Sequence, residues 1–419
     1  MVSESPIQRM AWIGSPSLVG VGGMCRLFLQ ELAKSGISVD VYSQNDPNEL
    51  PKLLGPETNT MRFFTFDHAW NWNSWYGRNA KLAFVMSFVK RLRSYRELVN
   101  CLIAEHRRKP YDVVVQFSQG ELFALGKHAG EIPIVLYPCV HAAGERYWCR
   151  KEEDIARRCE PWWWRKVRDL YLSYRSSLQK RDYRRARGVI GMSQRFNRWI
   201  EKDYGVSPEK MGFVYHPIKV PPPPVAPSNE EGELRIRLLF VGRISVRKGL
   251  EQLLEILPEL LNDHPDIKVA VIGGGSLWSN YEPLLEDFPI TRCTWIKALP
   301  NDKVIEEMQR SDILLVPSRY EPGGIVVGEA LACGMIVVAS DEVGSAENLP
   351  SSVCKQFRSG DRNGFKTAIQ AALADVRSHG SELREEARSV AKEQFDPAKM
   401  THLLLSELEH ILEGETVRR

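Results

Sequence analysis

One supersecondary pattern occurs twice in this chain, once on each side of a proline-rich stretch. The pattern is a short apolar run, a loop that contains glycine, a stretch with helical spacing of apolar residues and a second apolar run. It occupies residues 10–42 in the first half and 236–273 in the second. Continuous apolar runs separated by amphipathic helices are typical of parallel strands that helices cover on both faces. Each half is therefore predicted to form an α/β domain of the Rossmann type.

Further apolar runs extend both predicted sheets. They lie at 111–116, 132–137 and 188–192 in the first half, and at 313–317 and 335–339 in the second. The stretch 221–232 is rich in proline and polar residues, a composition typical of inter-domain linkers, and residues 397–413 have the apolar spacing of a helix. We expect an N-terminal domain over 1–218, which the helix at 396–419 rejoins, and a C-terminal domain over 219–395.

The composition excludes several classes of protein. The 419 residues carry 56 Lys and Arg against 53 Asp and Glu, and the net charge of +3 gives no sign of a nucleic-acid-binding protein. No run approaches the ~18 apolar residues of a transmembrane helix, and no signal-peptide pattern is present. The eight cysteines form no CxxC pair, so neither a zinc site nor a disulfide framework is indicated. We expect a reduced, cytoplasmic protein, with any membrane contact peripheral and at the inner face.

Linked motifs in the second half resemble those of a known enzyme family. Residues 241–249 read VGRISVRKG, residues 311–334 read SDILLVPSRYEPGGIVVGEALACG, and residues 344–347 read GSAE. In order and spacing they resemble glycosyltransferase family 4, the retaining enzymes of GT-B fold that use nucleotide sugars. The resemblance implies two Rossmann-like domains that face each other across a cleft. The N-terminal domain would bind the acceptor, and the C-terminal domain would bind the donor.

Two cations follow the first strand of the second half. Arg243 and Lys248 lie in the loop that leaves this strand, at the edge of the sheet where open α/β folds bind ligands. Two converging cations would neutralise the charge of a departing diphosphate, which is the role that the resemblance assigns to them. On spacing alone, a pair of solvated loop cations would be the alternative.

Two carboxylates stand eight residues apart in the longest motif. A helix of that length would span ~12 Å, which suits Glu321 at the sugar and Glu329 at the ribose of one donor, as the resemblance implies. Gly323, Gly324 and Ile325 open the following helix, where free backbone N–H groups can cradle a phosphate or a sugar hydroxyl. The alternative for Glu329 is an acid in the first helical turn that the helix dipole favours. Position 323 departs from the family, which usually has an aromatic residue there, so the sugar is not identified.

The first half offers weaker candidates for the site. Gly22 and Gly23 follow the first strand, where the resemblance places such a pair against the donor phosphate and the acceptor; an ordinary turn is the alternative. His141 follows another strand, and the resemblance implies that it orients the reacting sugar by a hydrogen bond. An ordinary buried histidine is the alternative, and Glu145 is a weak further candidate for the same site.

Two more residues of the first half match positions that the family uses. Ser193 either lines the cleft or caps a helix. His216 stands where the family often has Asn, and it is interpreted as a hinge or pocket-wall residue.

The resemblance also implies the course of the reaction. Retention of configuration is compatible with a double displacement through a carboxylate or with departure from the front face, and the residues do not choose between the two. No DxD motif is evident, which predicts a metal-independent enzyme without a cofactor. The rival functions are a nucleotide-sugar epimerase or phosphorylase of the same fold and a non-catalytic nucleotide-sugar-binding subunit.

A basic segment rich in tryptophan lies in the first half. Residues 150–187 carry thirteen Lys and Arg against six Asp and Glu, and they include three consecutive tryptophans at 162–164. Further basic residues lie between 90 and 109, and Trp70, Trp72 and Trp75 add aromatic side chains. Such a surface could dock on an anionic membrane or bind an anionic acceptor. The alternative is a solvated face whose tryptophans pack inward.

Overall fold

The chain folds into two compact units. The computed structural model describes residues 7–18, 20–45, 50–66, 80–223, 236–275, 280–286, 288 and 291–414. The first unit comprises Met1–Ala143, Ser173–Pro217 and Pro397–Arg419, and the second comprises Gly144–Leu172 and Ile218–Asp396. The sequence-based division differs from this one at residues 144–172, which it placed in the first domain. Trp70, Trp72 and Trp75 lie outside the described residues.

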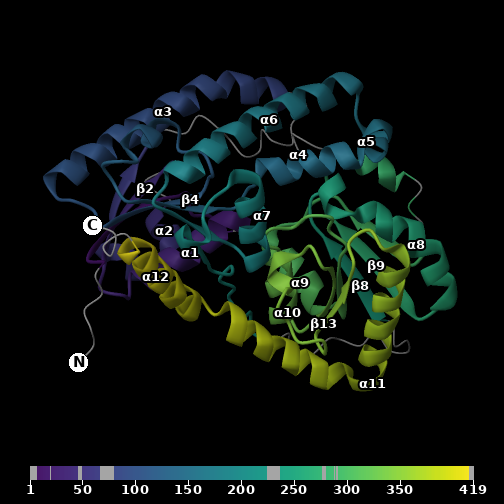
Figure 1. The fold of residues 1–419 in the computed structure, drawn as a ribbon. Helices are drawn as coiled ribbons and strands as arrows, with labels where there is room; N and C mark the ends of the chain where they lie inside the picture. Colours follow the sequence, from purple (N-terminus) through teal and green to yellow (C-terminus); the bar gives the residue numbers. More distant parts are fainter. Residues whose placement is uncertain are drawn as a thin grey trace. The chain divides into compact units, whose positions relative to one another are not determined.

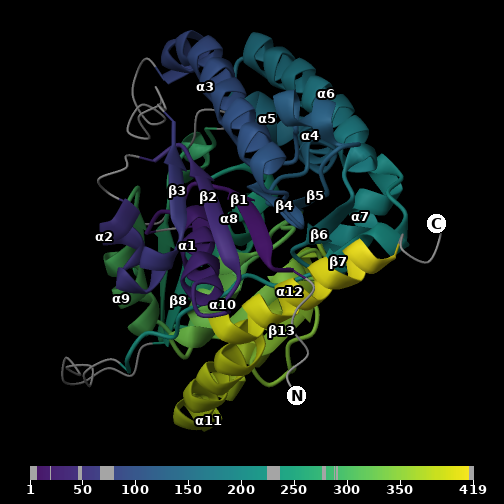
Figure 2. The same cartoon turned by 90° about the vertical axis from the view of Figure 1, so that its left-hand side faces the viewer.

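The first unit, shown in Figure 1, contains a parallel sheet in the order β3-β2-β1-β4-β5-β6-β7, and its strands are labelled in Figure 2. Its strands are β1 (Arg9–Ile13), β2 (Ser38–Ser43), β3 (Arg62–Thr65), β4 (Val113–Ser118), β5 (Ile134–Pro138), β6 (Gly188–Gly191) and β7 (Met211–Phe213). Strands β1 and β5 are buried along their whole length, as helices on both faces of a parallel sheet require.

Helices of this unit include α1 (Gly20–Leu32), α2 (Leu50–Leu54), α3 (Ala80–Arg108), α7 (Gln194–Tyr204) and α12 (Pro397–Glu413). The final helix, α12, packs against α1 and β7, as Figure 2 shows. Close packing explains a glycine in β6, since a Cβ at Gly188 would lie 2.4 Å from a side-chain carbon of Ile411. The last helix of the chain is thus an integral layer of the first unit.

The second unit repeats the topology with the order β10-β9-β8-β11-β12-β13. Its strands are β8 (Ile236–Val241), β9 (Ile267–Ile272), β10 (Cys293–Ile296), β11 (Ile313–Val316), β12 (Ile336–Ser340) and β13 (Cys354–Phe357). The helices over the described residues include α8 (Leu250–Asp263), α9 (Asn301–Gln309), α10 (Ile325–Ala332) and α11 (Arg362–Phe395). The inner side of α8, with Leu253, Ile256, Leu257 and Leu260 fully buried, forms the core against the sheet.

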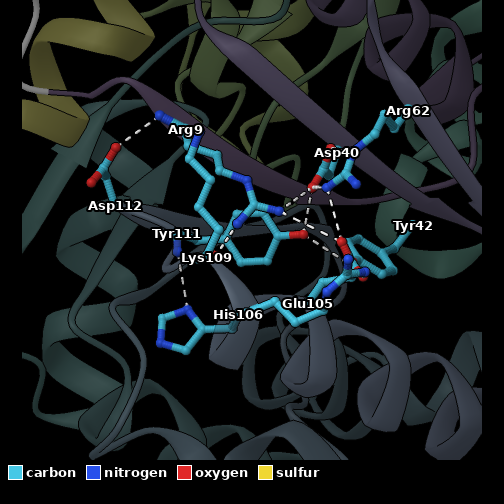
Figure 3. A network of polar contacts seen from close by, with 10 residues as sticks. Arg9, Asp40, Tyr42, Arg62, Glu105, His106, Lys109, Tyr111 and Asp112 are labelled. Atoms are coloured by element: carbon cyan, nitrogen blue, oxygen red, sulfur yellow. Dashed lines mark hydrogen bonds and ion pairs between the residues drawn. The ribbon is translucent and has the colours of Figure 1, made fainter.

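A buried ionic network closes the amino-terminal side of the first sheet (Figure 3). Asp40 of β2 is completely buried and accepts hydrogen bonds from Arg9 at 2.8 Å, from the Tyr111 hydroxyl at 2.6 Å and from Arg62 Nε at 2.8 Å. Glu105 at the end of α3 lies 3.1 Å from Arg62. This network lies away from the carboxyl ends of the strands, where ligands bind, so its role is to hold β1, β2, β3 and α3 together.

Three consecutive helices cover residues 142–185: α4 (Ala142–Lys151), α5 (Glu153–Cys159) and α6 (Trp162–Arg185). In both Figures 1 and 2, α4 lies beside α6. Arg146 and Arg150 of α4 bind Asp169 of α6 at 2.9 and 2.7 Å. None of the helices over the described residues combines the length and the apolar character needed to cross a membrane. All eight cysteines are described, and each is a free thiol.

Candidate active site

The strand order of the second sheet reverses between β8 and β11, and the candidate residues gather at this point. The chain leaves β8 at Val241, and Arg243 and a short helical turn, Val246–Lys248, follow. It leaves β11 at Val316, and Glu321 follows in the next loop. In open α/β sheets, ligands bind outside the carboxyl ends of the strands where the order reverses. The topology therefore brings two loops with opposite charges to the expected ligand-binding edge.

Two consecutive cations share one carboxylate oxygen at this edge. The ammonium of Lys248 donates a hydrogen bond to Oε2 of Glu321, and Nη1 of Arg247 donates to the same atom at 3.1 Å. All three side chains are largely buried, with exposed fractions of 13%, 17% and 11% for Lys248, Arg247 and Glu321. Arg243 is exposed to solvent. The structure thus brings the predicted Lys248 and Glu321 into direct contact.

The pKa shifts show how charge is distributed in this cluster. Burial would raise the pKa of Glu321, but the positive charges of Lys248, Arg247 and Arg243 outweigh it and hold this pKa at about 2. Burial lowers the pKa of Lys248, and the charges of Arg247 and Arg243 act in the same direction, against the opposing effect of Glu321. Three cations face one ionised carboxylate here. The excess of positive charge suits the binding of an anion.

Arg247 is the member of the cluster that the sequence analysis missed. Besides Glu321, its guanidinium lies 3.9 Å from a carboxylate oxygen of Glu145 in α4, which places the weak candidate Glu145 at the edge of the same cluster. The signal for Arg247 was its position directly before Lys248 in a turn after a buried strand. Neighbours in a tight turn often point apart, so the sequence alone did not show that both would reach Glu321.

The two loops are also joined through their backbones. The N–H of Arg319 donates to the carbonyl of Arg247 at 2.8 Å. The Arg319 side chain lies 2.8 Å from Glu251 of α8 and 3.1 Å from Glu152, the residue that joins α4 to α5. Burial raises the pKa of Glu251 to about 7, although Arg319 opposes this shift. This second ionic group fixes the loop after β11 against α8 and against the α4–α5 connection.

The loop from Glu321 to Gly324 is held by a short pairing with residues 342–345. The N–H of Glu321 donates to Glu342 at 3.1 Å, and Gly323 and Gly324 accept hydrogen bonds from the backbone and side chain of Ser345 at 2.7 and 2.8 Å. Gly324 has a positive φ of 84° and directly precedes α10, which Ile325 begins. A Cβ at this position would lie 2.7 Å from the hydroxyl oxygen of Ser345. The conformation and the space both require glycine here.

Glu329 lies in the second turn of α10. The helix begins at Ile325, so the alternative of an acid in the first helical turn does not hold. Burial raises the pKa of Glu329 to about 7, and within the described residues its carboxylate forms no ion pair. A half-buried carboxylate with a raised pKa is suited to accept hydrogen bonds from hydroxyl groups of a ligand.

The glycine pair of the first unit belongs to the first turns of α1. A loop was predicted there, but the helix starts at Gly20, so Gly22 and Gly23 are helical. A Cβ on Gly22 would meet the Ser17 side chain at 2.1 Å, and Ser17 N–H donates to the Gly22 carbonyl at 2.9 Å. The segment after β1 therefore folds back on the start of α1. A role of Gly22 and Gly23 toward a phosphate stays a prediction.

His141 is buried between β5 and α4 in the first unit. Its Nε2 lies 3.3 Å from Oδ2 of Asp203. Its ring makes edge-to-face contacts with the rings of Tyr204 and Phe196, at centroid distances of 4.9 and 5.9 Å. These contacts fix the ring at the carboxyl end of β5. Its proposed role in orienting a sugar stays a prediction.

Ser193 and His216 also lie in the first unit. Ser193 is fully buried, and its hydroxyl accepts a hydrogen bond from the N–H of Phe196 at 3.1 Å, which makes it the N-cap of α7. Of the two interpretations of Ser193, the structure shows the helix cap. His216 is buried, and it directly precedes Pro217, where the chain passes from the first unit to the second.

Comparison with known proteins decides the family. The model of "Glycosyltransferase Family 4" matches residues 19–220, and that of "Glycosyl transferases group 1" matches residues 226–392. The chain belongs to glycosyltransferase family 4. Curated relatives of this glycosyltransferase include an uncharacterized glycosyltransferase of Methanocaldococcus jannaschii, 32% identical over 117 residues that make up 28% of this chain and 30% of the relative. The sulfoquinovosyl transferase of Arabidopsis thaliana is 29% identical over 178 residues, 39% of this chain and 32% of the relative. The chain thus spans about a third of the length of each of these relatives.

Solved structures confirm the fold class of the glycosyltransferase. Sucrose-phosphate synthase from Thermosynechococcus elongatus superposes with a TM-score of 0.66 at 18% identity, over 95% of this chain and 97% of that chain. HepE from Anabaena, solved in complex with UDP-glucose, gives a TM-score of 0.63 at 16% identity, over 95% and 98%. These neighbours are glycosyltransferases of GT-B fold, as the sequence analysis expected. At such low identity they establish the fold alone.

Proposed function

We propose that this glycosyltransferase moves a hexose from a nucleoside diphosphate to a glycan, a glycolipid or a small glycosylated acceptor, with retention of configuration. One observation carries the proposal: Arg247 and Lys248 bind one carboxylate, that of Glu321, at the carboxyl edge of the second sheet, and the charge of Arg243 also acts on it. A diphosphate leaving group develops negative charge as the sugar bond breaks. Fixed cations in a partly buried site stabilise that charge in the transition state.

In the proposed complex, the diphosphate takes over the contact that Lys248 now makes with Glu321. Lys248 and Arg243 bind the phosphate oxygens, while Arg247 keeps Glu321 in place. The carboxylate of Glu321 then accepts hydrogen bonds from sugar hydroxyls, and Glu329 accepts them from the ribose. The N–H groups of Gly323, Gly324 and Ile325 at the start of α10 complete the donor site, since the first N–H groups of a helix have no acceptor within it.

We propose that the reaction needs no metal ion. In metal-dependent transfer, a divalent cation neutralises the diphosphate; here Arg243 and Lys248 would supply that charge. The structures of HepE with UDP-glucose and of a trehalose-6-phosphate protein from Escherichia coli with a fluorinated UDP-glucose support a nucleotide-sugar donor by analogy. We place the enzyme in the cytoplasm, in polysaccharide or glycolipid synthesis, with peripheral contact at the inner face of a membrane.

A thermal-shift screen tests the donor site directly. The probes are UDP, GDP, ADP and dTDP and their glucose conjugates, because a ligand that binds only the folded state raises the melting temperature. At least one nucleoside diphosphate is expected to stabilise the wild type and not the Lys248→Ala variant. Stabilisation of neither protein by any probe would contradict the proposal.

Turnover separates a transferase from its rivals. With the donor found in the screen, the nucleoside diphosphate should be released only after an acceptor is added, and equally with EDTA or with Mg²⁺. An epimerase would change the sugar without an acceptor, and a non-catalytic subunit would bind the donor and release nothing.

A further inference from the structure

The outward side of α6 carries apolar side chains that face water. Trp163, Val167, Leu170 and Tyr174 follow one another at intervals of three or four residues, so they lie along one side of the helix. Their exposed fractions are 48%, 47%, 73% and 59%, and that of the preceding Trp162 is 67%. We call Trp162, Trp163, Lys166, Val167, Leu170 and Tyr174 the α6 face. Exposed apolar groups that are clustered in this way mark a contact surface.

The same helix is well packed on its other side. Trp164 and Leu172 are buried, and the buried Arg168 forms an ion pair with Glu160. Tyr281 contacts the same carboxylate through its hydroxyl at 3.4 Å. The packing of its inner side therefore fixes the orientation of α6. Its outer aromatic side chains face water in a well-packed helix, so poor packing does not explain their exposure.

The helix α6 contains eight Lys and Arg and two Asp. Four of its arginines are paired with carboxylates: Arg165 with Glu153, Arg168 with Glu160, Arg175 with Glu121 and Arg181 with Asp182. Asp169 is bound by two arginines of α4, and Asp182 is completely buried and accepts a hydrogen bond from the N–H of Leu122 at 2.9 Å. Lys166 and Lys180 are exposed and form no ion pair with any residue that the structure describes. Lys166 and Lys180 thus add unpaired positive charge on and beside the α6 face.

We propose that the α6 face docks on a bilayer that contains anionic phospholipids. Tryptophan and tyrosine are the residues that settle at the level of lipid headgroups, and a helix with an apolar side flanked by Lys and Arg lies in the plane of that interface. Each cation close to an anionic surface strengthens binding by about five-fold. A soluble anionic acceptor would need a concave site with convergent donors, whereas the α6 face is one side of a single helix.

Vesicle sedimentation tests this inference. The probes are vesicles of phosphatidylcholine alone and vesicles in which about a third of the lipid is phosphatidylglycerol. The full chain is expected to sediment with the second kind, at least ten-fold more tightly than with the first, and to be released by high salt. Trp163→Ser with Leu170→Ser should weaken binding by at least ten-fold, since each removes a side chain that gains about ten-fold from apolar burial. Lys166→Glu with Lys180→Glu should weaken it to a similar extent.

Trp295→Ser is the matched control, because Trp295 is an exposed tryptophan (36%) of β10, outside the α6 face. This variant should bind like the wild type. Equal binding of wild type and face variants, or no preference for the anionic vesicles, overturns the proposal. The proposal is also overturned if the wild type is a dimer and the face variants are monomers, because the α6 face would then be the contact surface for a second copy of the chain. No sugar nucleotide is present in the assay, so its failure is independent of the proposed transferase activity.

Discussion

Nη1 of Arg247 lies 3.1 Å from Oε2 of Glu321, the oxygen that also accepts the hydrogen bond of Lys248. One carboxylate thus orients two cations that are consecutive in the chain. Arg247 also has Glu145 as a neighbour. Within the described residues, the ammonium of Lys248 forms an ion pair with Glu321 alone. We therefore propose that Arg247 holds Glu321 in position and that Lys248 contacts the diphosphate.

Replacement of Lys248 by alanine should lower kcat by about 100-fold or more, because it removes one preorganised group that stabilises the leaving diphosphate. The measurement is the rate of nucleoside diphosphate release at saturating donor and acceptor. Lys303→Ala, which removes an exposed lysine of α9, is the control and should leave kcat unchanged. If the kcat of Lys248→Ala stays within three-fold of the wild-type value, Lys248 has a structural role and does not stabilise the leaving diphosphate.

Replacement of Glu321 by glutamine should destabilise the fold at neutral pH by about 1–3 kcal/mol, because Arg247 and Lys248 then lack their shared carboxylate. The pKa of this group is lowered to about 2, so its stabilising contribution is complete above the ordinary glutamate pKa and is lost as the pH falls toward 2. Urea unfolding of Glu321→Gln, Lys248→Met and the double variant measures the coupling. Strictly additive losses would show that the ion pair contributes nothing.

Replacement of Glu329 by glutamine should stabilise the free enzyme at pH 8 and have little effect at pH 5. The pKa of the wild-type carboxyl is raised to about 7, so ionisation in the folded state opposes folding as the pH rises from the unfolded value through 7. We expect a gain of about 1–3 kcal/mol at pH 8, discounted for partial exposure. Melting curves at both pH values test the sign, with Glu306→Gln on the surface of α9 as control.

The same Glu329→Gln variant should bind the donor more weakly, because a neutral amide is a poorer acceptor than a carboxylate for ribose hydroxyls. Isothermal titration with the nucleoside diphosphate measures this effect. Unchanged affinity together with raised stability would remove Glu329 from the donor site.

Replacement of Ser193 by alanine should cost about 1 kcal/mol of stability, since it removes the N-cap of α7, and should leave kcat unchanged. Ser193→Asn should restore most of the loss, because asparagine is an equally good cap. A lower kcat at unchanged stability would instead support a place for Ser193 at the substrate.

Replacement of Asp40 by asparagine should destabilise the first unit by about 3–5 kcal/mol near pH 7, because the buried Arg9 loses its nearest counter-ion and keeps, among the described residues, only Glu105, 3.9 Å away. Burial opposes ionisation of Asp40, but hydrogen bonds from Arg62, Tyr111 and Arg9 outweigh it and lower its pKa. The difference between wild type and variant should therefore shrink as the pH falls below about 4. Asp154→Asn, at a side chain that is 98% exposed, should show no such trend.

The sequence predicted the buried parts of the fold well and the edges poorly. The run at 236–241 coincides with β8 and the final helix with α12, because long apolar periodicity leaves few alternatives. The edge strands β3, β7, β10 and β13 were missed, since each has three or four residues and one partner strand. Such strands are stabilised by pairing with the sheet more than by their own pattern.

The candidate site was predictable where a motif identified it. Lys248 and Glu321 were found, and the structure joins them directly. Arg247 was missed, and Glu145 was only a weak candidate beside His141. The proximity of these two residues depends on how the α4 segment packs in the second unit, a long-range contact without a local pattern. The same long-range packing explains why residues 144–172 belong to the second unit.

The hydrogen bond from Arg319 to the carbonyl of Arg247 has a consequence for protein engineering. Since it couples the loop after β8 to the loop after β11, a graft that imports only one loop from another enzyme would part the carboxylate from its cations. Attempts to change donor preference should transplant residues 242–249 and 317–325 as a single cassette.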